Sequence, residues 1–434
     1  MTRKMKDSGV EWIGEIPEDW SVSRLKNVLK ERNEKNNPIK TREVLSLMKN
    51  GGVIPYSEKG NIGNRAKEDV SLYKLVYTND IVLNSMNIII GSVGKSNYFG
   101  AVSPVYYTLY PRYEQYNVDY YNYVFQTKEF QNNLKGIGNG ILEHRMRIQM
   151  SKLNNVQLPI LSSLEQQKIV DILDDKVGRI DQIILETQQS IEELKKYKQS
   201  VITEAVTKGL DKKAKMKDSG IEWIGEVPID SKIVRIKNYF TLKGRIGWQG
   251  LTSAEYIGEG PYLITGVDFA NGEIDWSKSV HISEKRYEEA PEIHIKEGDL
   301  LITKDGTVGK VAITKNTPQK VSLNSGVMLI REKSDNSLNK RFVYYALLSD
   351  IFWKWFNLSN IGASTINHLY QGQFYNFSFP LMTIEKQNEI VLYLDYKTKI
   401  IDSLISTKEQ IINSYEQYKK SLIYEYVTGK KEVE

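Results

Sequence analysis

Apolar side chains recur at steps close to four and three residues in two long stretches of the chain. This is the spacing of a helical seam that packs against a second helix. The first stretch carries Leu173, Val177, Ile180, Ile184, Ile191 and Leu194, and Thr187 and Lys198 interrupt its seam. The second carries Leu394, Ile401, Ile405, Ile412 and Leu422. The pattern predicts two long helices with one apolar edge each.

Local signals predict where these helices begin and end. Pro159, followed by Ser162 with Glu165 three residues later, is the pattern of a helix start with a capping box, and Gly209 is a stop signal. The second helix is preceded by Pro380 and stops at Gly429. About 46 residues make a rod of roughly 70 Å. Since a polar-faced helix of that length is not stable alone, we expect the two to pair antiparallel; the alternative is that each covers its own domain.

The chain contains an internal repeat. Residues 4–17 read KMKDSGVEWIGEIP and residues 215–228 read KMKDSGIEWIGEVP, so twelve of fourteen positions match at an offset of 211. The helical stretches match at an offset of 221, with Gln166/Gln387, Asp181/Asp402 and Lys198/Lys419 among the pairs. Between these constant parts, residues 20–157 and 231–378 differ strongly. Two equal frames with unlike inserts predict two equivalent partner surfaces and two different recognition tasks.

Both variable segments mix short strands with helices. In the second, residues 300–303 and 311–314 read as strands around a glycine turn at 304–310. The first reads as the same unit with four more residues, a strand at 79–83 and a turn from Gly91 to Lys95. This turn resembles a phosphate-binding loop, but Ile89 stands where that motif needs glycine, so nucleotide binding is not favoured.

Polar and basic side chains gather at these predicted turns and at three further loops. Lysine and arginine suit phosphate contacts, and asparagine or aspartate can read base edges; for each single residue a solvated loop tip is an equally good interpretation. The candidate DNA-binding residues are Asn87, Lys95, Ser96, Asn97, Asn139, Arg145 and Arg147 in the first half, and Arg245, Trp248, Gln249, Lys304, Asp305, Thr307, Lys310, Ser364, Asn367 and His368 in the second.

Composition narrows the protein class. The chain has no cysteine, which excludes disulfides and thiolate metal sites and suits a reducing cytosol. No apolar run reaches the length of a membrane span, so we expect a cytoplasmic protein without a membrane partner. The net charge of +5 is compatible with a polyanion as partner. The four histidines lack metal-site spacing and no catalytic motif is present, so we expect no catalytic, cofactor or metal site in this chain.

In this combination the chain resembles the specificity subunits of Type I restriction-modification systems. The resemblance rests on the duplicated KMKDSG(V/I)EWIGE(I/V)P frame, the strand and glycine turn from Gly298 to Lys310, and the Glu-Gln-Gln-Lys-Ile-Val run from Glu165. It implies an α/β (α+β) fold with an internal pseudo-twofold repeat, in which two long antiparallel coiled-coil helices separate two globular target-recognition domains. The first domain departs from the pattern, because Asn79 replaces the glycine of Gly298.

The resemblance also implies partners. It implies double-stranded DNA with a bipartite asymmetric target, two methyltransferase subunits that bind S-adenosylmethionine and flip the target adenine, and restriction subunits that use ATP and Mg²⁺. The expected domains are a frame with recognition domain 1 (1–157), the first long helix (158–210), a frame with recognition domain 2 (211–378) and the second long helix (379–434). A stand-alone DNA methyltransferase, or a coiled-coil scaffold that binds only protein, would be the alternatives; neither needs two dissimilar readers on one symmetric support.

Overall fold

Two long helices run through the structure, a computed structural model that describes residues 3–48, 52–60, 69–138, 146–246, 250–333, 338–360 and 368–433. Helix α5 spans Ser163–Lys208 and helix α11 spans Ile384–Val427, so both predicted helices are confirmed. The predicted capping box at the start of α5 is half formed. The Glu165 amide donates to Ser162 Oγ at 3.2 Å, but the Glu165 carboxylate accepts from Trp20 Nε1 at 2.9 Å instead of returning to the cap. The helix start is thereby tied to the frame.

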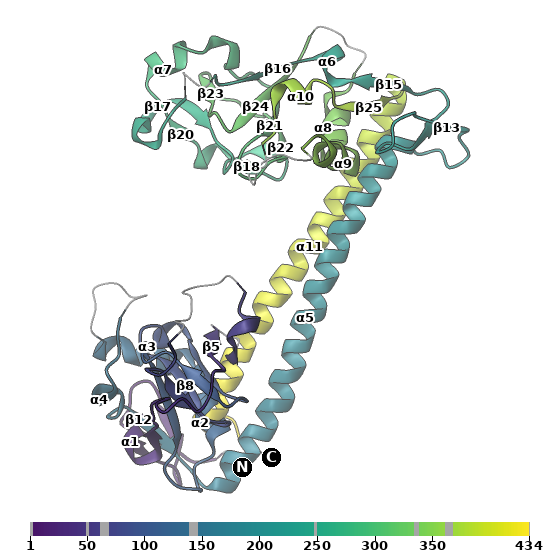
Figure 1. The fold of residues 1–434 in the computed structure, drawn as a ribbon. Helices are drawn as coiled ribbons and strands as arrows, with labels where there is room; N and C mark the ends of the chain where they lie inside the picture. The colour runs from purple at the N-terminus through teal and green to yellow at the C-terminus, as the bar shows by residue number, and fades with distance from the viewer. Residues whose placement is uncertain are drawn as a thin grey trace. The chain divides into compact units, whose positions relative to one another are not determined.

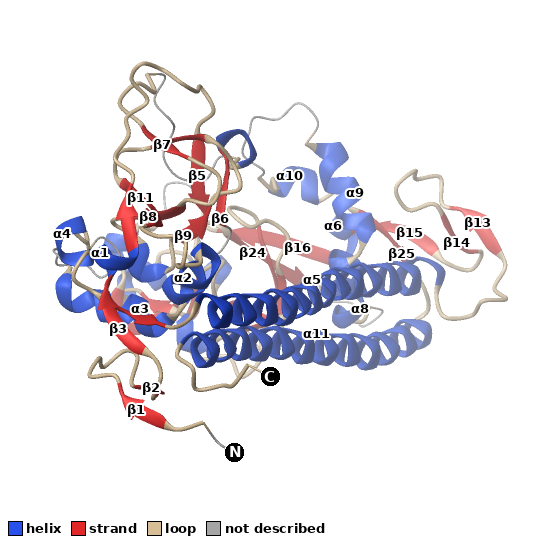
Figure 2. Cartoon of the chain, turned by 90° about the horizontal axis from the view of Figure 1, so that it is seen from below, coloured by secondary structure: helices blue, strands red, loops and turns tan. Residues whose placement is uncertain are grey.

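Two ion pairs show the direction in which the helices pair. Lys419 Nζ lies 2.6 and 2.7 Å from the carboxylate oxygens of Asp181, and Lys198 Nζ lies 2.7 Å from both oxygens of Asp402. At both places a residue early in one helix meets a residue late in the other, so α5 and α11 are antiparallel, as Figures 1 and 2 show. Lys198 interrupts the apolar seam because it makes this contact. Thr187 instead donates to the Ile183 carbonyl of its own helix, 2.6 Å away.

The seam side chains lie inside the helix pair or against the adjoining domains. The structure buries Leu173, Val177, Ile180, Ile191, Leu394, Ile401 and Leu422, and it half-buries Ile184, Leu194, Ile405 and Ile412.

The chain divides into two compact units, and each unit takes one part of each long helix. One consists of Met1–Gln188 with Glu409–Glu434, and the other of Gln189–Lys408. Residues 188 and 409 are equivalent at the repeat offset of 221. The two units therefore divide the long helices at equivalent positions of the repeat. Both ends of the chain belong to the first unit.

A four-stranded antiparallel sheet of the same order lies at the centre of each unit. In the first unit the order is β4 (Leu29–Glu31), β11 (Tyr106–Pro111), β8 (Ile81–Asn84), β9 (Val93–Lys95). In the second it is β16 (Phe240–Gly244), β24 (Val327–Glu332), β21 (Leu300–Thr303), β22 (Val311–Ile313). The segments that differ in sequence thus share the strand order of their central sheet.

Both faces of each sheet are covered, which explains why the middle strands read as continuous apolar runs. In β21, Leu300 and Ile302 pack in one apolar cluster, whereas Leu301 packs in another. In β8, Ile81 and Val82 divide between two clusters in the same way. Successive side chains in both strands therefore alternate between the two faces, but the sequence shows no alternation because both faces are apolar.

A pair of helices covers one face of each sheet. They are α2 (Val118–Gln126) with α3 (Lys128–Asn133), and α8 (Lys340–Leu348) with α9 (Asp350–Ser359). Asn117 caps α2, and its backbone amide donates to Gln166 Oε1 at 2.7 Å. Asn339 caps α8 and donates in the same way to Gln387 at 2.8 Å. These caps attach each domain to the start of its long helix.

Short elements complete each unit. In the first unit they are β1 (Met5–Asp7), β2 (Glu15–Pro17), β3 (Ser21–Arg24), α1 (Leu25–Val28), β5 (Leu45–Met48), β6 (Gly52–Pro55), β7 (Lys74–Val76), β10 (Gly100–Val102), α4 (Met150–Leu153) and β12 (Gln157–Ile160). In the second they are β13 (Met216–Asp218), β14 (Glu226–Pro228), β15 (Lys232–Arg235), α6 (Ile236–Tyr239), β17 (Ile257–Ile264), β18 (Phe269–Ala270), β19 (Glu273–Ile274), β20 (Val280–His281), α7 (Glu284–Glu288), β23 (Val321–Leu323), α10 (Gln371–Phe374) and β25 (Ser378–Leu381). Across the described residues, no helix combines the length and the apolar character of a membrane span.

Candidate nucleic-acid interface

Two loops meet at the same edge of the sheet in each unit. In the second unit, the loop between β21 and β22 (304–310) is joined to the segment after residue 367 by a hydrogen bond from the Leu369 amide to the Lys304 carbonyl, 3.0 Å long. In the first unit, the Ile148 amide donates to the Ser85 carbonyl at 2.8 Å, which joins the loop between β8 and β9 to the segment before α4. One backbone hydrogen bond thus holds the two candidate loops together in both units.

The glycine turn in the second unit is held by packing. Gly309 has a φ of +86°, and a Cβ on it would lie 2.6 Å from ring atoms of Trp353 in α9. Any larger residue would therefore strain the backbone and collide with the helix.

The predicted alignment of the two turns is wrong in the first unit. Gly91, with a φ of +88°, ends the β8–β9 loop as Gly309 ends the β21–β22 loop, and Val93–Lys95 form strand β9. The two loops therefore differ by one residue, at 85–92 and 304–310, rather than by four. Matching Gly94-Lys95 to Gly309-Lys310 in sequence therefore aligned residues of strand β9 with residues of the β21–β22 turn.

This register places the described candidate DNA-binding residues of the first unit at two opposite ends of the sheet. Asn87 lies in the β8–β9 loop, on the same edge as the exposed Arg147 next to Ile148. Lys95, by contrast, pairs with Ile81 at the opposite end of the sheet and forms an ion pair with Asp119.

Ser96 and Asn97 follow Lys95 at that opposite end. Ser96 is buried, and its hydroxyl donates to the Tyr98 carbonyl at 2.9 Å, whereas Asn97 is exposed. The structure does not bring these two residues to the edge that holds Asn87.

The second-unit candidates do come together. Asp305 forms an ion pair with His368, which links the turn to the neighbouring loop, and Thr307 is exposed at the tip of the turn. Lys304 is half-buried beside Gly244. Lys310 is half-buried and donates from Nζ to the Gly266 carbonyl at 3.0 Å, so it also braces the turn.

Arg245 lies at the end of β16 on the same edge but points inward. It is 3% exposed, and its guanidinium donates to the Leu323 carbonyl at 2.7 Å and to Ser322 Oγ at 2.8 Å. Burial lowers the pKa of this guanidinium, with the nearby Arg286 acting in the same direction. In this arrangement Arg245 supports the loop edge. The candidates Asn139, Arg145, Trp248, Gln249, Ser364 and Asn367 lie outside the described residues.

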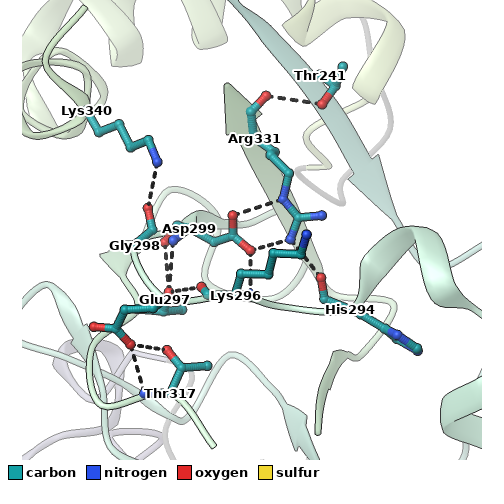
Figure 3. A network of polar contacts seen from close by, with 10 residues as sticks. Thr241, His294, Lys296, Glu297, Gly298, Asp299, Thr317, Arg331 and Lys340 are labelled. Atoms are coloured by element: carbon teal, nitrogen blue, oxygen red, sulfur yellow. Dashed lines mark hydrogen bonds and ion pairs between the residues drawn. The ribbon is translucent and has the colours of Figure 1, made fainter. Parts of the chain in front are cut away.

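Sequence reasoning missed an aspartate that positions the loop strand in each unit. In the network of Figure 3, Asp299, which directly precedes β21, accepts from Arg331 of β24 and from the Lys296 amide, the latter at 2.7 Å. Arg331 also donates to the His294 carbonyl at 2.7 Å, and Thr317 binds Glu297 on the neighbouring turn.

Asp80 does the same before β8. It accepts from the Tyr77 amide at 2.8 Å and from Arg32 at 2.7 and 3.0 Å. Asp80 is 2% exposed and Asp299 5%. The arginine follows β4 in the first unit, whereas it lies within β24 in the second. The shared signal was an aspartate just before each apolar strand.

Among the residues that the structure describes, no group of three histidine, cysteine, aspartate or glutamate side chains gathers to hold a metal ion. The geometry of the described loops is that of a binding edge built from a braced turn and a second loop.

Comparison with known proteins agrees with this architecture. A family model for the Type I restriction modification DNA specificity domain matches residues 17–196 and 228–414. The putative type I restriction enzyme MjaX specificity subunit of Methanocaldococcus jannaschii is 28% identical over 437 residues, which cover 96% of this chain and 95% of that protein.

Solved structures share the fold. A chain from work on complex assembly and conformational transition of the type I R-M system has a TM-score of 0.70 at 14% identity, over 95% of this chain and 98% of that one. The HsdS subunit from Thermoanaerobacter tengcongensis has a TM-score of 0.50 at 15% identity, over 96% and 98%.

Proposed function

The chain belongs to the family of Type I restriction modification DNA specificity domains, and from this membership we propose that each of its units reads one half of a split DNA target. The observation that supports this assignment most is that one binding edge occurs twice with unlike side chains. The bond from Leu369 to Lys304 and the bond from Ile148 to Ser85 build the same edge. The residues presented there differ, so the two edges suit two different half-sites.

The reading residues we propose are those at the loop edges. Asn87 and Arg147 would contact the first half-site, and Lys304, Asp305, Thr307 and His368 the second. Amide, carboxylate, hydroxyl and imidazole groups can bond to base edges in the major groove, whereas lysine and arginine also reach phosphates. Arg245 and Lys310 would act by holding the edge in place, because Arg245 is buried and bonds to the Leu323 carbonyl, and the half-buried Lys310 bonds to the Gly266 carbonyl.

Chemistry would reside in partner subunits of the complex. As a specificity subunit the chain works with modification and restriction subunits and with DNA. We propose that two methyltransferase subunits, carrying S-adenosylmethionine, dock on the two equivalent frames, that ATP and Mg²⁺ act in the restriction subunits, and that this chain catalyses no step. The repeat supports two copies, because equivalent surfaces bind identical partners. The site of action would be the cytoplasm, where the DNA lies.

Co-expression with the cognate methyltransferase tests this function. Adenine methylation mapped by single-molecule sequencing should reveal a new motif with two defined halves and an unread spacer. The matched control is the same methyltransferase without this chain, which should leave no such motif. A stable complex that binds DNA but adds no methylation at any split motif would contradict the proposal.

A further inference from the structure

We propose that each unit carries a second DNA contact, a phosphate-binding corner at the end of the sheet opposite the loop edge. The corner is the same in both halves. This inference rests on the proposed function, because it assumes that DNA is the ligand. It adds a sequence-independent anchor to the two sequence-dependent edges.

A short motif repeats inside the divergent segments. Arg24-Leu25-Lys26-Asn27 and Arg235-Ile236-Lys237-Asn238 match at the frame offset of 211. They form the entry into helices α1 and α6, just before the first strand of each sheet. A motif kept where the neighbouring sequence differs points to a ligand that is the same for both halves.

A third cation joins each motif from the end of the neighbouring strand. In the first unit Arg112 Nε donates to the Lys26 carbonyl at 2.8 Å, and in the second Lys333 Nζ donates to the Lys237 carbonyl at 2.6 Å. Arginine has been exchanged for lysine, yet the hydrogen bond and the positive charge remain. We call Arg24, Lys26 and Arg112 the first basic corner, and Arg235, Lys237 and Lys333 the second.

The charge of these corners is available to a ligand. Five of the six cations are exposed and Lys237 is half-buried. No carboxylate pairs with any of them among the residues that the structure describes. Elsewhere on the chain exposed lysines often do have such partners, as Lys315 with Glu273 and Lys320 with Glu284.

In the second unit the corner opens into a hollow suited to an anion. An open cavity of about 690 Å³ is lined by Lys237, Lys333, Asn238, Asn376, Thr241 and Tyr375, with no acidic residue. The two lysines offer ammonium groups and the two asparagines offer amide groups, whereas the hydroxyls of Thr241 and Tyr375 donate to backbone carbonyls of the protein. Lysine and asparagine are among the side chains that bind DNA phosphates.

The position of the corner fits a duplex that meets the loop edge. Lys237 precedes β16, and Gly244 ends β16 beside Lys304. A strand of five residues is about 16 Å long, comparable to the roughly 12 Å width of the major groove. A phosphate strand that borders the groove read by the loops can therefore lie over the corner.

Salt dependence of DNA binding by the complex with methyltransferase tests the corner. We expect the double variant Lys237→Gln/Lys333→Gln to bind target and non-target duplexes more weakly by the same factor. The slope of log K against log salt should fall by about 0.9 for each phosphate that the variant no longer neutralises. The methylated motif should not change. Lys26→Gln/Arg112→Gln should behave alike. Lys285→Gln, an exposed lysine on α7, is the matched charge control and should leave the slope unchanged.

Further variants separate this proposal from a structural role. Lys333→Arg should retain the wild-type slope, because Arg112 makes the same hydrogen bond in the first unit. An unchanged slope in the Gln variants would overturn the proposal, as would loss of methyltransferase from the complex with no change in slope. Non-target duplex binding measures the corner even if the wild-type complex methylates no split motif, so the two proposals fail separately.

Discussion

Lys419 in α11 and Asp181 in α5 form an ion pair that Lys198 and Asp402 repeat at the equivalent positions of the other unit. The lysine side chains are 28% and 29% exposed and the aspartate side chains 53% and 55%. Two ion pairs with the same partners and the same surroundings are what a twofold repeat requires. They specify the register of the antiparallel helices.

Because both pairs face solvent, each should add little stability. We expect a double-mutant cycle of Lys419→Ala and Asp181→Ala to give a coupling free energy of about 0.2–1 kcal/mol. Urea titration followed by circular dichroism measures it. The charge-swapped pair, Lys419→Asp with Asp181→Lys, should recover most of the coupling; a swap no better than Lys419→Asp alone would contradict an ion pair in this register.

Breaking the aspartate–arginine pair beside the loop strand should be far more costly. Arg331→Met leaves the Asp299 carboxylate, 6% exposed in its side chain, without its charged partner. We expect a loss of about 3 kcal/mol in the free energy of unfolding of that unit, measured as a lower Tm by calorimetry. Lys285→Met, at an exposed site on α7 of the same unit, is the control. A Tm within about 1–2 °C of wild type, roughly the scatter for an exposed site, would contradict the role assigned to Asp299.

Alkaline pH should weaken the attachment of each domain to its long helix. Tyr123 donates to Asp174 at 2.6 Å and Tyr345 to Asp395 at 2.5 Å. Burial, together with these carboxylates, raises the pKa of both phenols above their ordinary value of 10.0. Since the folded pKa is the higher one, the contribution is fully present below pH 10.0 and is lost as the pH rises beyond it.

The pH effect can be measured as the fall in Tm between about pH 9 and 11, roughly one pH unit either side of the ordinary tyrosine pKa. The variant Tyr123→Phe/Tyr345→Phe should show a smaller fall than wild type. An equal fall in both proteins would mean that other groups cause the alkaline loss.

The corrected register of the first unit gives a test of its reading residues. Asn87→Ala or Arg147→Ala should alter or weaken recognition of one half-site, because both residues lie on the loop edge. Lys95→Gln should leave the methylated motif unchanged, since its ammonium group meets Asp119 at the far end of the sheet. Methylation mapping of the three variants distinguishes them. A changed motif with Lys95→Gln alone would favour placing Gly94-Lys95 at the reading edge.

The sequence was most informative where a residue pattern repeats. The two helices, their bounds at Ser163 and Lys208, and the duplicated frame follow from periodicity and from matches that need no side-chain geometry. The shared sheet order could not be predicted from the variable segments, because strands as short as β4 and β9 pair with partners about 80 and 12 residues away in the sequence.

The error at Gly91 has a local cause. Glycine followed by lysine occurs at Gly94-Lys95 and at Gly309-Lys310, but the turn is defined by a positive φ, which belongs to Gly91 and Gly309. Gly94 sits inside a strand, where a Cβ would lie 2.7 Å from the Gly52 Cα. A glycine is needed at position 94 because two backbones approach each other there, whereas Gly91 and Gly309 are needed for their positive φ. The sequence alone does not distinguish these two reasons for a glycine.

The most direct test of two independent readers is a domain exchange. Residues 20–157 would be replaced by the corresponding segment of another specificity subunit, and adenine methylation would be mapped with the same methyltransferase. We expect a split motif in which one half is new and the other half is that of the original chain. A motif in which both halves change, or neither does, would contradict the assignment of one half-site to each unit.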